Sequence, residues 1–98
     1  METADDRLRF AQAELEDRIG SFATRYGFRP KDFHLTWDGA HLDPSRTIHE
    51  LVITTQDGRR AEMAVSHETL LARDPWTHVR DIEAALSKLQ RRTGGRGE

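Results

Sequence analysis

Two strand-like runs separated by a short turn are the feature that most limits how this chain can fold. Residues 48–55 (IHELVITT) are rich in β-branched side chains, and residues 59–65 (RRAEMAV) alternate polar with apolar positions. Between them, Gln56-Asp57-Gly58 supplies the residue types that a tight hairpin turn needs. The pattern predicts two antiparallel strands.

The length of the turn decides which face of the hairpin is buried. A two-residue turn places Val52 opposite Met63, whereas a three-residue turn with Gly58 in a bulge places Leu51 opposite Met63. We favour the three-residue turn because it gathers five apolar side chains on one face. These five are Leu51, Ile53, Ala61, Met63 and Val65. A slip of one residue would exchange the two faces.

An amphipathic helix is predicted before the hairpin. Its apolar side chains recur at spacings of three and four, which places them on one stripe. The stripe consists of Leu8, Ala11, Leu15, Ile19, Phe22 and Tyr26. Thr3 or Asp5 can cap the start, and Gly27 followed by Pro30 predicts the end. Residues 32–37, in which Phe33, Leu35 and Trp37 alternate with polar positions, then predict a third strand.

The closing segment is predicted to be helical in two pieces. Residues 66–73 form a short helix, and Asp74-Pro75 begins a second one, with Asp at the cap and Pro in the first turn. The apolar stripe of that last helix consists of Val79, Ile82, Leu86 and Leu89. Residues 94–98 are a Gly- and Arg-containing tail.

The expected fold is one α+β domain over residues 1–93 with the order α-β-β-β-α. Two helices pack on one face of a three-stranded antiparallel sheet, since both apolar stripes need a surface to cover. A chain of 98 residues supports a single core and little more. The predicted core includes Leu15, Phe22, Ile53, Met63, Ile82 and Leu86.

No residue pattern indicates catalysis, a metal or a cofactor. Cysteine is absent, which excludes disulfides and thiol chemistry. The five histidines are His34, His41, His49, His67 and His78, and their spacing matches no zinc motif. We therefore expect surface or boundary histidines, no catalytic, metal or cofactor residues, and no enzymatic activity.

Composition suggests where such a chain works. It has 13 Arg against 2 Lys and no Asn, a bias typical of a GC-rich bacterial genome. No apolar run approaches the roughly 20 residues of a membrane helix, and residues 1–10 do not resemble a signal peptide. We expect a cytoplasmic protein with no membrane contact.

Four apolar residues are candidate contacts for a partner. Phe10 lies nearly opposite the stripe of the first helix, and Trp76 lies at the edge of the last one. Ile48 and Val52 fall on the side of the sheet away from the core in the favoured register. These positions predict a non-enzymatic protein-interaction or adaptor module, with another protein as the partner. It should be a monomer or associate only weakly with itself, because charged side chains share that side.

The alternative is a weak double-stranded nucleic-acid-binding module. The element order resembles that of double-stranded-RNA-binding domains, but residues 66–75 carry two acids and no Lys where those domains are Gly- and Lys-rich. The chain is therefore not assigned to that family. A basic patch would have to come from Arg59, Arg60, Arg91 and Arg92. The formal net charge of −2 disfavours nucleic acid as the partner.

Overall fold

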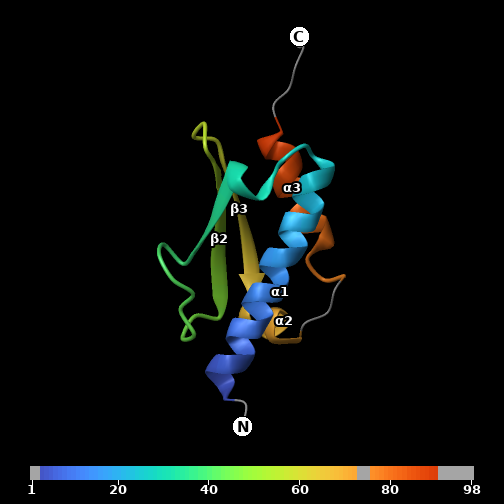
Figure 1. The fold of residues 1–98 in the computed structure, drawn as a ribbon. Helices are drawn as coiled ribbons and strands as arrows, with labels where there is room; N and C mark the ends of the chain where they lie inside the picture. The colour runs from blue at the N-terminus through green and yellow to red at the C-terminus, as the bar shows by residue number, and fades with distance from the viewer. Residues whose placement is uncertain (1–2, 73–75, 91–98) are drawn as a thin grey trace.

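Three strands and the helices packed beside them make up the part of the chain that the computed structural model describes, residues 3–72 and 76–90. The elements are α1 (Ala4–Arg25), η1 (Pro30–Asp32), β1 (Phe33–Trp37), β2 (Ile48–Thr55), β3 (Arg60–Ser66), α2 (His67–Ala72) and α3 (Val79–Leu89). The strands form one antiparallel sheet in the order β1-β2-β3. The helices lie on one side of the sheet (Figure 1). The predicted α+β fold and element order are confirmed.

The hairpin has the three-residue turn. Leu51 pairs with Met63, and Ile53 pairs with Ala61. The Gly58 N–H donates to the Thr55 carbonyl at 3.0 Å. Gly58 has φ +93°, a backbone conformation that favours glycine and completes the bulge. Leu51, Ile53, Ala61, Met63 and Val65 are all buried, so the favoured register is confirmed.

The ends of α1 are set by local hydrogen bonds. The Thr3 side chain accepts from the Asp6 N–H, and the Asp6 side chain accepts from the Thr3 N–H, which makes a capping box. At the other end the Phe28 N–H donates to the Ala23 carbonyl at 3.0 Å. Gly27, with φ +86°, allows the chain to turn back in this way.

The core lies between the sheet and the helices. Five of the six predicted core residues are buried, whereas Phe22 is only half-buried. Ala23, four residues after the buried Ile19, takes the buried position at this level of α1. Trp37 is buried as expected, at 2% exposure.

The predicted start of the last helix at Asp74-Pro75 lies outside the described residues, as do residues 91–98 with the predicted tail. Residues 76–78 form a turn, and α3 begins at Val79. Its buried side chains are Ile82, Ala85, Leu86 and Leu89. In the described ranges no helix is long and apolar enough to cross a membrane.

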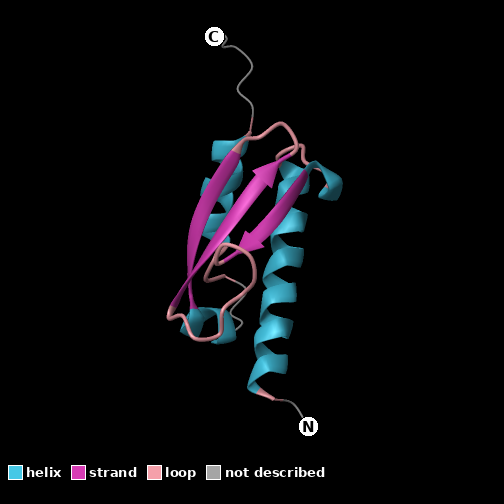
Figure 2. Ribbon diagram, turned by 90° about the vertical axis from the view of Figure 1, so that its left-hand side faces the viewer, coloured by secondary structure: helices cyan, strands magenta, loops and turns pink. Residues whose placement is uncertain are grey.

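Figure 2 looks onto the sheet with the helices behind it. β1 forms the edge nearer to α1, and β3 forms the edge nearer to α3. The face turned toward the viewer carries the side chains of even-numbered strand residues, including the exposed Glu50 and Glu62. The helices therefore cover one face of the sheet and leave the other open.

Replacing Leu86 with Ala should lower the free energy of unfolding by about 2–5 kcal/mol, because it leaves a cavity at a fully buried site. Urea unfolding followed by circular dichroism measures the change. Ser87→Ala, at an exposed position of the same helix, is the control and should change it by less than about 0.5 kcal/mol. An equal effect of both substitutions would contradict the packing of α3 on the sheet.

Candidate functional site

The outer edge of β1 has no partner strand in the described part of the chain. Just beyond this strand, the Asp38 N–H bonds to the Glu50 carbonyl of β2 at 2.8 Å. Because hydrogen-bonding direction alternates along an antiparallel strand, the even-numbered residues of β1 face β2. The backbone groups of Phe33, Leu35 and Trp37 therefore point away from the sheet.

The turn after β1 uses one of these outward groups. The Trp37 carbonyl accepts a hydrogen bond from the Ala40 N–H at 2.9 Å. The Phe33 carbonyl and both backbone groups of Leu35 have no backbone partner within residues 3–72 and 76–90. Such a row of groups is a template to which an extended chain can add as a further strand.

The opposite edge of the sheet is protected by charge. Arg60 and Glu62 of β3 form an ion pair at 3.2 Å, and both side chains are more than half exposed, at 62% and 55%. Charged side chains on an edge strand discourage pairing with another chain. The sequence of β1 (FHLTW) contains no Asp, Glu, Lys or Arg. Of the two edges, β1 is the one suited to accept a strand.

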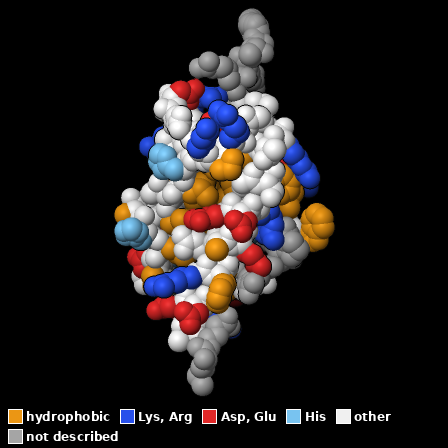
Figure 3. Space-filling model, viewed as in Figure 1, with side chains coloured by type: hydrophobic (Ala, Val, Ile, Leu, Met, Phe, Trp, Pro, Cys, Tyr) orange, Lys and Arg blue, Asp and Glu red, His pale blue; other side chains and the backbone are white. Residues whose placement is uncertain are grey.

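A groove runs beside this edge, between β1 and α1. Two hollows form it, one of about 500 Å³ near Trp37 and one of about 690 Å³ near Phe33, and both are lined by Glu16 and Leu35. Its apolar lining includes Leu8, Pro30, Phe33, Leu35, Trp37 and Leu42. Figure 3 shows hydrophobic side chains between the helix and the strands, with acidic side chains next to them. We call this feature the β1 groove.

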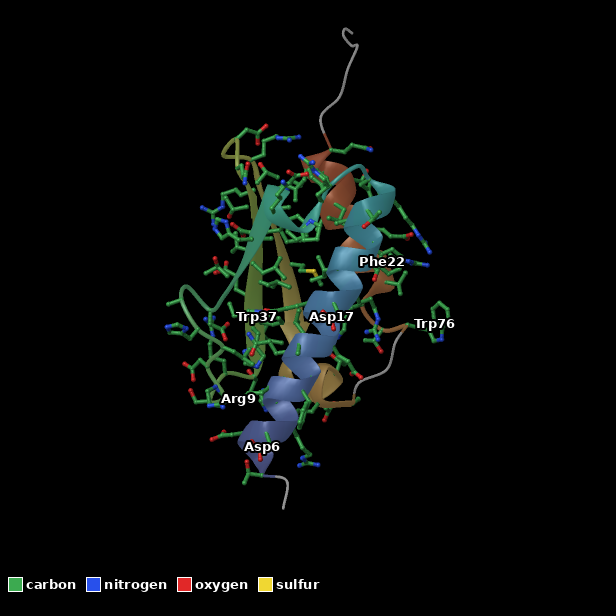
Figure 4. The ribbon with its side chains drawn as sticks, viewed as in Figure 1. Asp6, Arg9, Asp17, Phe22, Trp37 and Trp76 are labelled. Atoms are coloured by element: carbon green, nitrogen blue, oxygen red, sulfur yellow. The ribbon has the colours of Figure 1, made fainter. Side chains whose placement is uncertain are left out.

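Carboxylates of α1 form one wall of the β1 groove. The Trp37 indole Nε1–H donates to Glu16 Oε2 at 2.7 Å, which fixes this carboxylate beside the strand. Asp17 follows it along the helix and lines the hollow near Phe33. Figure 4 shows Trp37 on the strand side and Asp17 on the helix. Among the residues that the structure places, no Arg or Lys pairs with Glu16 or Asp17.

The far end of the groove is walled by the loop of residues 38–47, which Asp38 organises. Its Oδ1 accepts from the Glu50 N–H at 2.9 Å and lies 3.3 Å from Arg46 Nη1. Its Oδ2 accepts from the Asp43 N–H at 2.9 Å and lies 2.7 Å from His49 Nδ1. Burial raises the pKa of Asp38, but the two backbone N–H groups and the His49 ring together hold it below its ordinary value.

Asp38 is the first of three side chains joined by hydrogen bonds, followed by His49 and His67. His49 is fully buried, and its Nε2 lies 2.8 Å from Nδ1 of His67 at the start of α2. An ionised Asp38 requires hydrogen on His49 Nδ1, so in the neutral ring Nε2 accepts from the His67 Nδ1–H. The backbone N–H of His67 donates to the Thr47 carbonyl at 2.9 Å. The chain thus joins the loop, β2 and α2.

We call the hydrogen-bonded chain of Asp38, His49 and His67 the relay. Within the described ranges, no Ser or Thr hydroxyl donates to either imidazole. Nor does any group of three His, Asp or Glu side chains there have an arrangement that could hold a metal ion. In this structure the relay fixes the loop that walls the β1 groove.

The expectation of surface or boundary histidines holds for His34 and His41, which are exposed. It is wrong for His49 and His78, which are 0% and 5% exposed. The sequence did indicate that His49 is buried, because in the favoured register it lies on the same face of β2 as Leu51. No such pattern marks Asp38, whose side chain is placed by the loop.

The four candidate partner contacts are not gathered beside β1. Phe10, Ile48 and Trp76 are exposed, at 56%, 52% and 79%, but they lie on α1, on β2 and in the turn before α3. None of them lines the β1 groove. Val52 faces the open side as predicted, yet it is only 8% exposed, because its neighbours on β1 and β3 cover it. The expectation of an exposed Val52 is wrong.

The proposed basic patch is largely occupied by internal contacts. Arg59 Nε donates to Asp57 at 3.0 Å, and Nη1 donates to the Leu89 carbonyl at the end of α3. Its guanidinium also lies 5.9 Å from the centre of the Phe28 ring. Arg60 pairs with Glu62. Arg91 and Arg92 lie outside the described residues.

Comparisons with models of protein families, with curated proteins and with solved structures found no match to this chain. No relative therefore supplies a function, a ligand or a set of site residues.

Replacing Asp38 with Asn should destabilise the protein at pH 7 by about 1–3 kcal/mol, because the charged acceptor of several hydrogen bonds is lost. Asn tolerates the φ of +49° found at this position, so backbone strain does not change. The folded-state pKa of Asp38 lies below its ordinary value. Its stabilisation is therefore complete above the unfolded pKa and is lost as the pH falls through the folded pKa.

Urea unfolding between pH 7 and pH 2 measures this difference between the two proteins. The gap should narrow as the pH falls through the folded pKa of Asp38, because the protonated carboxyl is neutral like the Asn side chain. Glu83→Gln, at an exposed position of α3, is the control and should show no such gap. A difference that stays constant with pH would show that Asp38 does not act through its charge.

Proposed function

We propose that this chain is a non-enzymatic protein-interaction module that binds an extended segment of another protein by strand addition to β1. The observation that carries the proposal is the row of outward backbone groups on Phe33 and Leu35, placed directly beside the β1 groove. Backbone hydrogen bonds would supply affinity, and the groove would select side chains.

The dimensions of a sheet support this mode of binding. An added strand lies about 4.8 Å from its neighbour, and alternate side chains point to opposite faces. One set would enter the β1 groove beside α1, and the other set would lie beside the exposed His34 on the open face. Each new backbone hydrogen bond contributes about 0.5–1.5 kcal/mol net, so a few of them plus apolar burial suffice for micromolar affinity.

The remaining features fit a binding role better than a catalytic one. The His49–His67 relay is hydrogen-bonded to a structural loop and contacts no hydroxyl nucleophile in the described segments. The proposal places the module in the bacterial cytoplasm, supported by the Arg-rich, Asn-free composition and the lack of cysteine. It acts as a monomer or with weak self-association.

Nucleic-acid binding, the alternative, loses support from the structure. Arg59 donates to Asp57 and to the end of α3, and Arg60 is paired with Glu62. Side chains engaged in this way must break internal contacts before they reach a phosphate. The carboxylates of the β1 groove would also repel a nucleic-acid backbone.

Substituting Leu35 with Pro should weaken strand addition, because Pro removes an N–H that points outward. The ladder with β2 does not use this N–H, and edge strands tolerate Pro at such positions. Random peptides displayed on phage are selected on the wild-type protein and then titrated by fluorescence anisotropy. We expect at least tenfold weaker binding to Leu35→Pro, about 1.4 kcal/mol. Leu35→Ala retains the N–H and should bind better than Leu35→Pro.

Hydrogen exchange of the wild-type protein gives a readout that does not depend on either variant. Binding of a selected peptide should slow exchange of the Phe33 and Leu35 amides, while amides on the β3 edge stay unchanged. Failure to enrich any peptide would refute the proposal. So would peptides that protect α3 or β3 instead of β1.

A further inference from the structure

The β1 groove combines two kinds of surface that one type of side chain can satisfy together. Its strand side is apolar, through Phe33, Leu35 and Trp37, and its helix side presents the carboxylates of Glu16 and Asp17. Long Lys and Arg side chains lay an aliphatic stem on an apolar surface and keep the charged group at its rim. A purely apolar side chain would leave the carboxylates facing it without a counter-charge.

The charge of the groove is uneven along its length. Near Trp37, the hollow is lined by Asp5 and Glu16 but also by Arg9. Near Phe33, the hollow is lined by Glu16 and Asp17 and by no Arg, Lys or His. The cation-attracting part of the groove is therefore the half beside Phe33 and Leu35, where the outward backbone groups lie.

The carboxylate of Glu16 is already oriented for contact with a cationic side chain. Its Oε2 accepts from the Trp37 indole at 2.7 Å and from Gln12 Nε2 at 3.4 Å, so the side chain is oriented in advance. Both donors are neutral, and its charge is not matched by any cation in the described residues. A cationic side chain of a ligand would supply that match.

A second copy of this chain is a poorer occupant of the groove. A symmetric pairing of two β1 strands would place both α1 helices on the same face, along one seam. Glu16 and Asp17 of one molecule would then meet the same carboxylates of the other. Like charges brought together across an interface disfavour that complex.

We propose that the strand bound at β1 is a basic segment of another protein, in which Arg or Lys occupies alternate positions facing the groove. This inference rests on the proposed function. The stems of these side chains lie along Phe33 and Leu35, and their cationic groups reach Glu16 and Asp17. The other alternate positions face the open side of the sheet and are less restricted.

The test uses three synthetic peptides of about eight residues, a typical strand length. Each alternates Thr with one other residue, which is Arg, Leu or Glu. Binding to the wild-type protein is measured by fluorescence anisotropy at low and at physiological salt. The Arg peptide should bind about tenfold more tightly than the Leu peptide at low salt, the Glu peptide should bind most weakly, and the preference for Arg should shrink as salt rises.

Matched variants locate the effect. Glu16→Gln keeps an oxygen that can accept the Trp37 indole hydrogen and removes only the charge, and Asp17→Asn does likewise. The double variant should bind the Arg peptide about 2- to 30-fold more weakly, because two exposed ion pairs are lost. The double variant Asp81→Asn/Glu83→Gln changes the net charge by the same amount at exposed positions of α3 and should leave binding unchanged.

The outcomes separate the two proposals. Equal binding of the Arg and Leu peptides, with protection of the Phe33 and Leu35 amides, would overturn the charge preference and leave strand addition standing. An equal loss in the α3 double variant Asp81→Asn/Glu83→Gln would assign the effect to net charge and also overturn it. Failure of all three peptides, together with failure of the peptide selection, would overturn both proposals. A dimer formed through β1 in sedimentation experiments would replace the basic segment with a second copy.

Discussion

One buried carboxylate holds the end of β1, the loop after it and the start of α2 in a single arrangement. Asp38 accepts hydrogen bonds from the Asp43 and Glu50 N–H groups and contacts His49, whose ring continues to His67. A side chain that is 1% exposed and charged is costly unless its lone pairs are satisfied, and here four donors surround it. The shape of the β1 groove depends on this network, because the loop forms one of its walls.

Local patterns were enough to predict the fold. The capping box at Thr3, the glycine at position 27 and the turn at Gly58 each act within a few residues, so sequence alone identifies them. The two possible hairpin registers differ in which residues of β2 share a face with Met63: the three-residue turn places Leu51 and Ile53 there, and the structure has this register. The prediction that Val52 is exposed was wrong, because flanking strands can cover a residue of the central strand even on an open face.

The site could not be predicted in the same way, because its contacts join distant segments. Asp38 and His49 are 11 residues apart, and His49 and His67 are 18 apart. Glu16 and Trp37 are separated by 21 residues and belong to different elements. The sequence did mark β1 as uncharged. The position of its outer edge beside the acidic side of α1 could not be predicted, because it depends on how the helix packs on the sheet.

The bond between Glu16 and the Trp37 indole links stability to binding. A buried indole N–H needs an acceptor, and a carboxylate is a stronger one than a neutral amide. The use of a carboxylate as acceptor places the negative charge of Glu16 at the rim of the β1 groove. Water is partly excluded there, so the attraction for a cation is less screened. Packing α1 against the strand through an acid therefore closes the core and, by the same contact, gives the open edge a preference for a basic chain.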